Sequence, residues 1–354
     1  MKFNTKRRWQ IIFDYMIGWT LAFIFISIVR GVGTTEAGSV QFELSTSIAY
    51  SMVFGPIFGA ISGLIQVKTE EHYYRRLSLQ KMLIVRILYG ICLLIFIVVV
   101  SYAVVPRSMG VEIGLLQFAF EDGSFPIYFY IFTVDVFMAL LRQVNLMLGP
   151  QKLLKLIFGR YYTPREEERI FMFLDLQSST LLAEKLGHEK YSSMIQECFN
   201  DLGVVVENEA EIYQYVGDEV VLTWKLRDGL RNLNCIQAFF NFKQQLKSKR
   251  QFYLDKFGCE PFFKAGLNEG LVMVTEIGRY KKEIAYHGDA INTAARIQGK
   301  CNELNQEFLI SANLKDKLSP SAHNFDALPP IPLKGKQKEV SIYAVSLPND
   351  SIAT

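Results

Sequence analysis

Two acidic residues stand where a fold can aim both carboxylates at one point. Asp175 ends a short apolar run, residues 170–174, that has the length of a buried strand. Asp218 lies between two β-rich runs, residues 211–215 and 219–224, which predict a hairpin with Asp218 at its tip. Hard cations such as Mg²⁺ bind through one or two carboxylates together with substrate phosphates. The pattern predicts a metal site, although either acid alone fits an ordinary strand end or turn.

The segment after Asp175 turns into a predicted helix. Its first residues are Leu176, Gln177, Ser178, Ser179 and Thr180. Backbone N–H groups at a helix N-terminus bind anions. A metal-binding wall and a phosphate cradle are therefore expected within six residues of each other.

Two further groups of residues suit phosphate chemistry. Asn292 and Arg296 are four residues apart on a predicted helix, so they project from one face. An amide beside a guanidinium suits charge that develops on a phosphate and a ribose oxygen. Lys334 and Lys336 lie between predicted strands and could reach phosphates. A solvated helix face and ordinary loop charge are the alternatives.

The elements that carry these residues occupy only the second half of the chain. Half of the 354 residues are apolar, and residues 1–150 hold 12 Lys/Arg and 9 Asp/Glu against 26 of each in the remainder. The first half contains four long apolar runs, each able to cross about 30 Å of hydrocarbon as a helix. They are residues 11–29, 44–67, 87–105 and 127–148. Four such runs exceed what the core of a soluble domain needs.

The distribution of basic residues predicts how these spans are oriented. Lys and Arg precede the first span, lie between the second and third, and follow the fourth, while the other two loops carry little. Because positive residues mark cytoplasmic loops, both termini are expected on the cytoplasmic side of the cell (inner) membrane.

Several residues within the spans invite prediction. Gly55, Gly59 and Gly63 repeat at four-residue spacing, which predicts a close helix-packing face. Asp135 and Arg142 are seven residues apart on one helix face and could pair inside a bundle; the alternative is that Arg142, near the cytoplasmic end, extends to the membrane surface. A transporter is disfavoured, because four spans with one buried acid offer little pathway.

Composition excludes other classes. The net charge of +3, without a basic block, argues against a nucleic-acid partner. The five cysteines lack CxxC spacing, which argues against structural zinc and a disulfide scaffold.

The predicted organisation has three parts: an all-α transmembrane bundle of four helices in residues 1–150, a coupling helix or linker in 151–168, and an α/β (α+β) domain in 169–354. The linker is apolar on one side, so we expect it to pair between two copies and transmit movement of the spans. Residues 262–268 and 271–277 are expected to form a hairpin around Glu269 and Gly270.

The second half resembles the class III nucleotide cyclases over about residues 155–347. The resemblance rests on five motifs in the family's order: FMFLDLQSSTLLAE, YQYVGDEVVLTW, the stretch 263–278, HGDAINTAARIQ and LKGK. It implies a ferredoxin-like, palm-type sheet covered by helices. It also implies an enzyme that makes a 3′,5′-cyclic nucleotide and pyrophosphate from a nucleoside triphosphate.

The resemblance also implies residue roles. Asp175 and Asp218, with the Leu176 carbonyl, would hold two Mg²⁺ or Mn²⁺ ions, and the neighbouring turn residue Gly217 would help to bind the nucleotide. Asn292 would orient the ribose, Arg296 would stabilise the transition state, and Lys334 would bind the terminal phosphates. The site would form in a homodimer, with metal acids from one copy and the Asn/Arg helix from the other. Most relatives with such a membrane half have six spans, and four is a departure.

The positions that read the base depart from the family pattern. Gln214 and Ala285 stand where ATP-using members carry Lys and Asp or Thr, and GTP-using members carry Glu and Cys or Ser. A glutamine amide both donates and accepts, so it accommodates either purine. Adenylate cyclase is the expected activity because that activity is common among such proteins. Guanylate cyclase, diguanylate cyclase and a non-catalytic nucleotide-binding receptor remain as alternatives.

Overall fold

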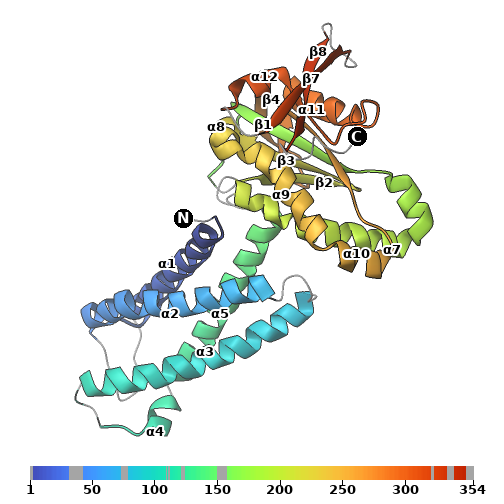
Figure 1. The fold of residues 1–354 in the computed structure, drawn as a ribbon. Coiled ribbons are helices and arrows are strands. Elements are labelled where there is room, and N and C mark those ends of the chain that lie inside the picture. The colour runs from blue at the N-terminus through green and yellow to red at the C-terminus, as the bar shows by residue number, and fades with distance from the viewer. Residues whose placement is uncertain are drawn as a thin grey trace. The chain divides into compact units, whose positions relative to one another are not determined.

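The computed structural model describes residues 3–31, 43–72, 79–108, 110, 112–120, 124–149, 158–319, 323–332 and 339–347. The chain divides into two compact units, Met1–Leu148 and Gly149–Thr354 (Figure 1). Residues 151–157 of the predicted linker, with Leu154 and Ile157 on its apolar side, lie outside the described residues.

The first unit is helical throughout its described length. Its elements are α1 (Phe3–Gly31), α2 (Leu44–His72), α3 (Leu79–Ser108), the short α4 (Leu115–Ala119) and α5 (Ser124–Leu148). Four of these helices contain stretches long and apolar enough to cross a membrane: Arg7–Gly31, Leu44–Glu71, Ile84–Val104 and Ser124–Met147. Each overlaps one of the four predicted spans, so the prediction of four long apolar helices is confirmed.

The glycine stripe of α2 brings its backbone against that of α1. A Cβ atom at Gly59 would lie 2.4 Å from Cα of Met16, and one at Gly55 would lie 2.5 Å from Cα of Thr20. A Cβ at Gly63 would also meet the α1 backbone. Contacts this close leave room only for hydrogen, so the predicted packing face is confirmed.

The two charged residues of α5 bind other helices rather than each other. Asp135 accepts a hydrogen bond from Arg86 of α3 at 2.7 Å, and Arg142 donates to Glu70 of α2 at 2.6 Å. The expected Asp135–Arg142 pair is therefore wrong. Seven residues advance a helix by roughly 10 Å, which is too far for direct contact, and both residues find partners on neighbouring helices.

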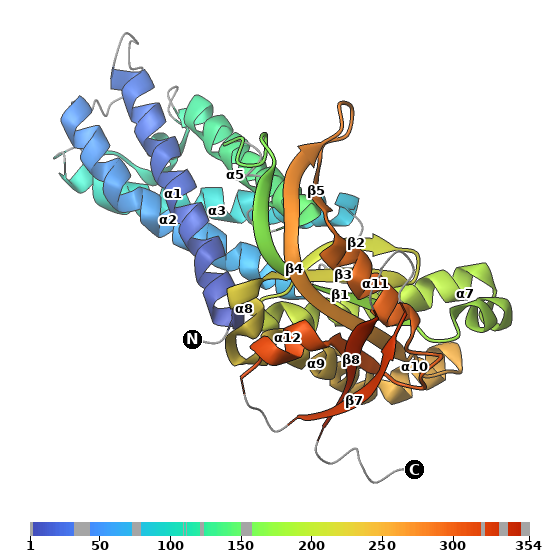
Figure 2. The same ribbon diagram turned by 90° about the horizontal axis from the view of Figure 1, so that it is seen from above.

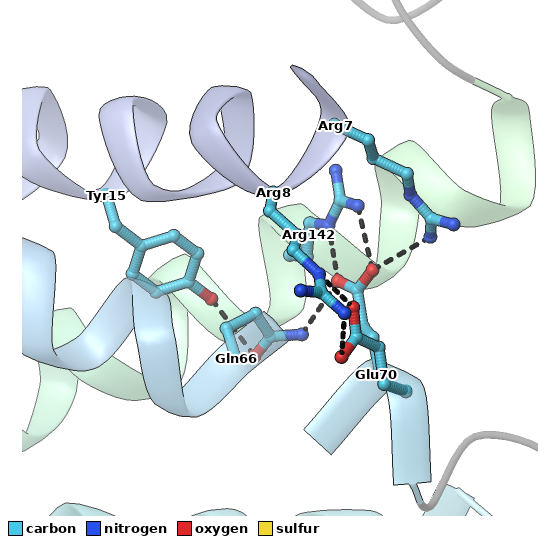
Figure 3. A network of polar contacts seen from close by, with 7 residues as sticks. Arg7, Arg8, Tyr15, Gln66, Glu70 and Arg142 are labelled. Carbon is cyan, nitrogen blue, oxygen red and sulfur yellow. Dashed lines mark hydrogen bonds and ion pairs between the residues drawn. The ribbon is translucent and has the colours of Figure 1, made fainter. Parts of the chain in front are cut away.

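These ion pairs belong to a continuous series of polar contacts along one face of α2, and Figure 3 shows its part around Gln66, Glu70 and Arg142. Ser62 donates to Asp135 at 3.1 Å, and Gln66 accepts from the Tyr15 hydroxyl of α1 at 3.3 Å. Gln66 in turn donates to Glu70 at 3.1 Å. All four long helices thus contribute to one buried network. We call the residues that follow the polar seam: Ser62, Gln66, Glu70, Arg86, Asp135 and Arg142.

The second unit is built on one mixed sheet. Its strands are β1 (Arg165–Leu176), β2 (Glu211–Val216), β3 (Glu219–Lys225), β4 (Phe263–Ile277), β5 (Glu283–His287), β6 (Phe308–Ser311), β7 (Asn324–Ile331) and β8 (Val340–Ser346). The order is β2-β3-β1-β4-β6-β8-β7, with β5 added beside the second half of β4. Only the β4–β6 pairing is parallel.

Helices cover both faces of this sheet. They are α7 (Ser179–Asp201), α8 (Leu226–Leu230), α9 (Asn234–Ser248), α10 (Arg250–Phe257), α11 (Asp289–Gly299) and α12 (Ala312–Lys317), with 3-10 turns at Leu202–Asn208 and Arg231–Leu233. Alternate residues of β1 face opposite sides. Ile170 and Met172 pack in a large core with α7, α9 and α10, whereas Phe171 and Phe173 pack in a smaller core with α11. The α/β architecture with helices on the sheet is therefore as predicted.

Two strand predictions need correction. We expected the linker to continue through Glu168, but β1 already begins at Arg165 and pairs with β4 from there. The expected turn at Glu269 and Gly270 is absent, because β4 runs unbroken through both residues and pairs Gly270 with Arg169. A single glycine interrupted the apolar pattern without interrupting the ladder of hydrogen bonds.

Candidate active site

The two predicted metal acids lie at the same end of two neighbouring strands. Asp175 is the penultimate residue of β1 and stands opposite Glu219 of β3. Asp218 occupies the tight turn between β2 and β3. It follows Gly217, which adopts a positive φ of 63° without steric cost because glycine has no Cβ. Burial and then the charge of Asp218 raise the pKa of Asp175. The fold thus brings the two carboxylates close enough to interact electrostatically.

A third carboxylate, not singled out from the sequence, belongs to the same group. Burial, followed by the charges of Asp175 and Asp218, raises the pKa of Glu219 to about 7. Its side chain shares a sheet face with that of Asp175, because the two residues are directly opposite in an antiparallel pair. The signal was present in the sequence: the residue after a hairpin acid is the first residue of the returning strand.

This acidic group suits a divalent cation. The Oδ2 atom of Asp218 is buried and has no hydrogen-bond partner among the described residues. A buried carboxylate oxygen without a partner is costly, and a cation relieves that cost. In the described part of the chain no three His, Cys, Asp or Glu side chains surround a single point closely enough to hold a metal. Backbone, water and substrate oxygens would therefore complete the coordination.

The start of α7 lies beside the acids. Ser178 precedes the helix with a left-handed φ of 57°, and its side chain makes no capping hydrogen bond. Tyr191, farther along α7, has a pKa raised by burial and then by the charge of Asp218. The 23-residue helix α7 therefore lies near the carboxylates, and its first turn follows β1 directly. Gln177 and Thr180 in this segment are exposed.

Helix α11 carries the predicted amide and guanidinium. Asn292 is exposed and Arg296 is half-buried. The helix is fixed to β4, because a Cβ at Gly266 would lie 2.2 Å from the Gln298 nitrogen, and Asn268 donates to the Ala290 carbonyl at 2.9 Å. The Gln298 side chain also opposes the rise in the pKa of Asp175. Within one chain, then, the end of α11 lies near the acidic group, while Asn292 is open to solvent.

The remaining predicted residues are spread over other elements. Gln214 is exposed on β2, after an irregularity in its pairing with β3. Ala285 is buried on β5, opposite Thr275. Leu176 is buried at the end of β1. Lys334 and Lys336 lie outside the described residues.

The fold and this group of residues define a nucleotide cyclase domain. The family model for the adenylate and guanylate cyclase catalytic domain matches residues 161–346, more than half of the chain. The chain therefore belongs to the class III nucleotide cyclase family.

Individual relatives agree with this assignment. Adenylate cyclase 2 of Rhizobium meliloti (strain 1021) is 36% identical over 179 residues, which are 50% of this chain and 49% of that protein. The chain thus spans about half the length of this curated relative. Two structures of bacterial light-regulated adenylyl cyclases are each 19% identical and share the fold, with TM-scores of 0.54 and 0.52. The alignments cover 63% and 60% of this chain, and 66% and 62% of those chains.

Proposed function

We propose that this chain is a membrane-bound adenylate cyclase that converts ATP to 3′,5′-cyclic AMP and pyrophosphate. The observation that carries the proposal is the acidic group at the end of β1. Asp175, Asp218 and Glu219 lie together, and one buried oxygen of Asp218 lacks a partner. An uncompensated concentration of negative charge beside a helix N-terminus suits a divalent cation bound to a triphosphate.

Asp175 and Asp218, with the Leu176 carbonyl, would hold two Mg²⁺ or Mn²⁺ ions. Such ions supply positive charge that makes the ribose 3′-hydroxyl more acidic and neutralises the triphosphate. In the reaction the 3′-oxygen forms a bond to the α-phosphorus, and the bond from that phosphorus to the bridging oxygen breaks. The electron pair leaves with pyrophosphate, and the hydroxyl proton passes to solvent. The chain's own task is to hold these atoms in line.

The other residues of the site would bind and orient the nucleotide. Asn292 would hold the ribose, and Arg296 would stabilise charge on the α-phosphate. Asn292 is exposed on α11, so it is available to serve the site of a second copy. This supports a homodimer with two equivalent sites. Lys334, Lys336 and the start of α7 would bind the terminal phosphates.

The base preference is the finer part of the proposal. The similarity to adenylate cyclase 2 of Rhizobium meliloti supports adenine as the base. The Gln214 amide can donate and accept, so it is compatible with either purine. Guanylate cyclase activity is therefore the second candidate. The four apolar helices would place the chain in the inner membrane with both termini in the cytoplasm, where ATP is available.

The decisive experiment is a product assay with the purified full-length chain in lipid nanodiscs. ATP and GTP are each supplied with Mn²⁺ or Mg²⁺, and the products are separated by chromatography. We expect cyclic AMP from the wild type and a loss of about a hundredfold or more in Asp218→Asn. Asp326→Asn is the matched control, because Asp326 is exposed on β7, and it should keep full activity.

Three results would contradict the proposal. A wild type that makes no more product than Asp218→Asn would favour a non-catalytic receptor, provided that it still binds nucleotide. Cyclic GMP as the dominant product would replace adenylate with guanylate cyclase. A cyclic dinucleotide from GTP would point to a different reaction altogether.

A further inference from the structure

A fully buried arginine lies beneath the strands that carry the two base-reading residues. Arg169 of β1 has 0% of its surface exposed. Its Nη1 donates to Glu167 at 2.9 Å and its Nε donates to the Thr223 hydroxyl at 3.1 Å. Its Nη2 lies 3.2 Å from a carboxylate oxygen of Glu211. Nε and Nη1 are thus hydrogen-bonded within the sheet, whereas Nη2 is paired with Glu211 by charge and has no hydrogen-bond partner among the described residues.

The flat face of the same guanidinium lies against a tyrosine. The Cζ atom of Arg169 is 4.8 Å from the centre of the Tyr286 ring, within the range of a cation–π contact. The Tyr286 ring meets that of Tyr213 edge to face, with centres 4.9 Å apart, and that of Phe171 at 5.4 Å. We call Arg169, Tyr213 and Tyr286 the tyrosine stack.

The tyrosine stack joins two strands that have no backbone pairing with each other. In the described sheet β2 pairs with β3 and β5 pairs with β4, while β1 lies between β3 and β4. Strands β4 and β5 curve up from the rest of the sheet in Figure 2. The backbone links β2 to β5 only by way of β3, β1 and β4, so the direct contact between these two strands is made by side chains. Arg169 reaches both, through Glu211 on β2 and Tyr286 on β5.

Each tyrosine is the immediate neighbour of a base-reading residue. Tyr213 precedes Gln214 on β2, and Tyr286 follows Ala285 on β5. Successive residues of a regular strand such as β5 face opposite sides, so a side chain packed behind the strand fixes the position of its neighbour in front. On β2, Tyr213 occupies the irregularity directly before Gln214, so its packing fixes where Gln214 re-enters the pairing with β3. A shift of either ring moves the backbone that presents Gln214 or Ala285 to the purine.

We propose that Arg169 is a positioning residue for the purine pocket: by holding Tyr286 against Tyr213 it fixes the distance between Ala285 and Gln214 and thereby sets discrimination between ATP and GTP. The inference rests on the proposed function, because it takes these two residues as the readers of the base. It adds to that function a residue that touches neither nucleotide nor metal.

The same guanidinium is also tied to the point where the chain enters this domain. Glu167, which accepts from Arg169, accepts a second hydrogen bond from the Tyr161 hydroxyl at 3.0 Å. The Tyr161 carbonyl accepts from the Glu276 backbone of β4 at 2.8 Å. Selectivity should therefore respond to changes at Tyr161 as well as within the tyrosine stack.

The experiment compares Arg169→Met with Lys317→Met in the full-length chain. Lys317 is the matched control, because it pairs with Glu168 of β1 and Glu269 of β4 but contacts neither β2 nor β5. For each variant, kcat and KM are measured with ATP and GTP. Affinities are measured with fluorescent N-methylanthraniloyl derivatives of both nucleotides, and the melting temperature reports folding.

We expect Arg169→Met to change the ratio of kcat/KM for ATP over GTP by about tenfold, mainly through KM, while kcat with ATP stays within about threefold. Arg169→Lys should recover part of the ratio, since it keeps the charge but not the flat face. Tyr213→Leu, at a half-buried position on an edge strand, should shift the ratio in the same direction and serves as the test if Arg169→Met does not fold. Lys317→Met should leave the ratio unchanged.

Equal losses with ATP and GTP in Arg169→Met and Tyr213→Leu, at an unchanged ratio, would overturn the inference and assign Arg169 a purely structural role. A wild type that binds both fluorescent nucleotides but makes no cyclic product would instead refute the proposed function. In that case the ratio of the two affinities still decides the role of Arg169.

Discussion

Arg86 in the helical unit and Arg169 in the cyclase domain have nearly the same neighbours in very different surroundings. Each is buried, each binds a carboxylate and a hydroxyl, and each lies over a tyrosine ring, at 5.7 Å for Arg86 and 4.8 Å for Arg169. The partners differ in exposure. The side chain of Asp135 is 4% exposed, whereas those of Glu167 and Glu211 are 16% and 28% exposed.

That difference assigns different roles to the same chemistry. The cyclase domain is assembled by two apolar cores, so Arg169 adjusts strands that are already in place. Between helices in lipid there is little hydrophobic driving force, so packing and polar contacts must hold them together. Arg86 and the rest of the polar seam are therefore expected to fasten the helices.

Arg86→Leu breaks this comparison most severely. It leaves the Asp135 carboxylate buried without its cation, which costs about 3–5 kcal/mol. Arg169→Met should cost less, because water can reach Glu167 and Glu211. Thermal unfolding of the purified chain in one detergent measures both. The double variant Arg86→Leu/Asp135→Asn should recover most of the loss, and a double variant as unstable as the sum of its parts would refute the fastening role.

Gly59→Leu tests the other contact that holds the helical unit. The new side chain would meet the α1 backbone at Met16, and backbone cannot rotate away, so we expect a loss of about 1–3 kcal/mol. Gly18→Ala is the matched control, because a Cβ at Gly18 meets only the flexible end of the Met138 side chain. Equal melting temperatures for the two variants would count against the glycine stripe as a rigid contact.

The acidic group predicts that metal binding depends on pH. A carboxyl whose folded pKa is raised keeps its proton to higher pH, so a metal must displace a proton from Glu219 below about pH 7. The pKa of Asp175 is also raised, so this group adds to the effect. Mn²⁺ affinity should rise from pH 5.5 to 7 and then level off. The metal-free domain should correspondingly lose stability as the pH rises from the ordinary Glu pKa of 4.5 towards 7.

Titration calorimetry with Mn²⁺ and the full chain, without nucleotide, measures this dependence. Glu219→Gln removes one of the two raised groups and should flatten the rise. Glu283→Gln, at an exposed position of β5, should leave it unaltered. An affinity that does not vary between pH 5.5 and 7 would show that no proton is displaced.

The smallest effect is expected at an exposed pair in the cyclase domain. Arg250 and Glu260 are 2.8 Å apart, but their side chains are 64% and 39% exposed. Arg250→Ala should change the free energy of unfolding by less than about 1 kcal/mol. A loss as large as that of Arg86→Leu would show that burial does not determine how much an arginine ion pair contributes to stability.

The sequence predicted elements better than it predicted partners. The four long helices, the hairpin at Asp218 and the sheet with its helices follow from local pattern, and local pattern is what hydropathy and turn residues record. The Asp135–Arg142 pair failed because partners in a bundle come from other helices, which spacing along one helix does not describe. Arg86 precedes the predicted third span, 87–105, by one residue, so the sequence pattern assigns it to the loop. In the structure it lies within α3, which begins at Leu79.

The candidate site shows the same limit. Asp175, Asp218, Asn292 and Arg296 were found through motifs, each of which is continuous in the sequence. Glu219 and Arg169 were not, because their importance depends on cross-strand neighbours and on the distance between β2 and β5. Such contacts appear only once the register of the sheet is known.

The glycine stripe has a mechanical consequence. Because their backbones are in direct contact, α1 and α2 cannot slide past each other without a clash, so we expect them to move as one rigid pair. A rearrangement carried along α5, the last described helix before the cyclase domain, would then have to shift α5 relative to the α1–α2 pair. Such a shift would break the Glu70–Arg142 and Ser62–Asp135 hydrogen bonds between α2 and α5.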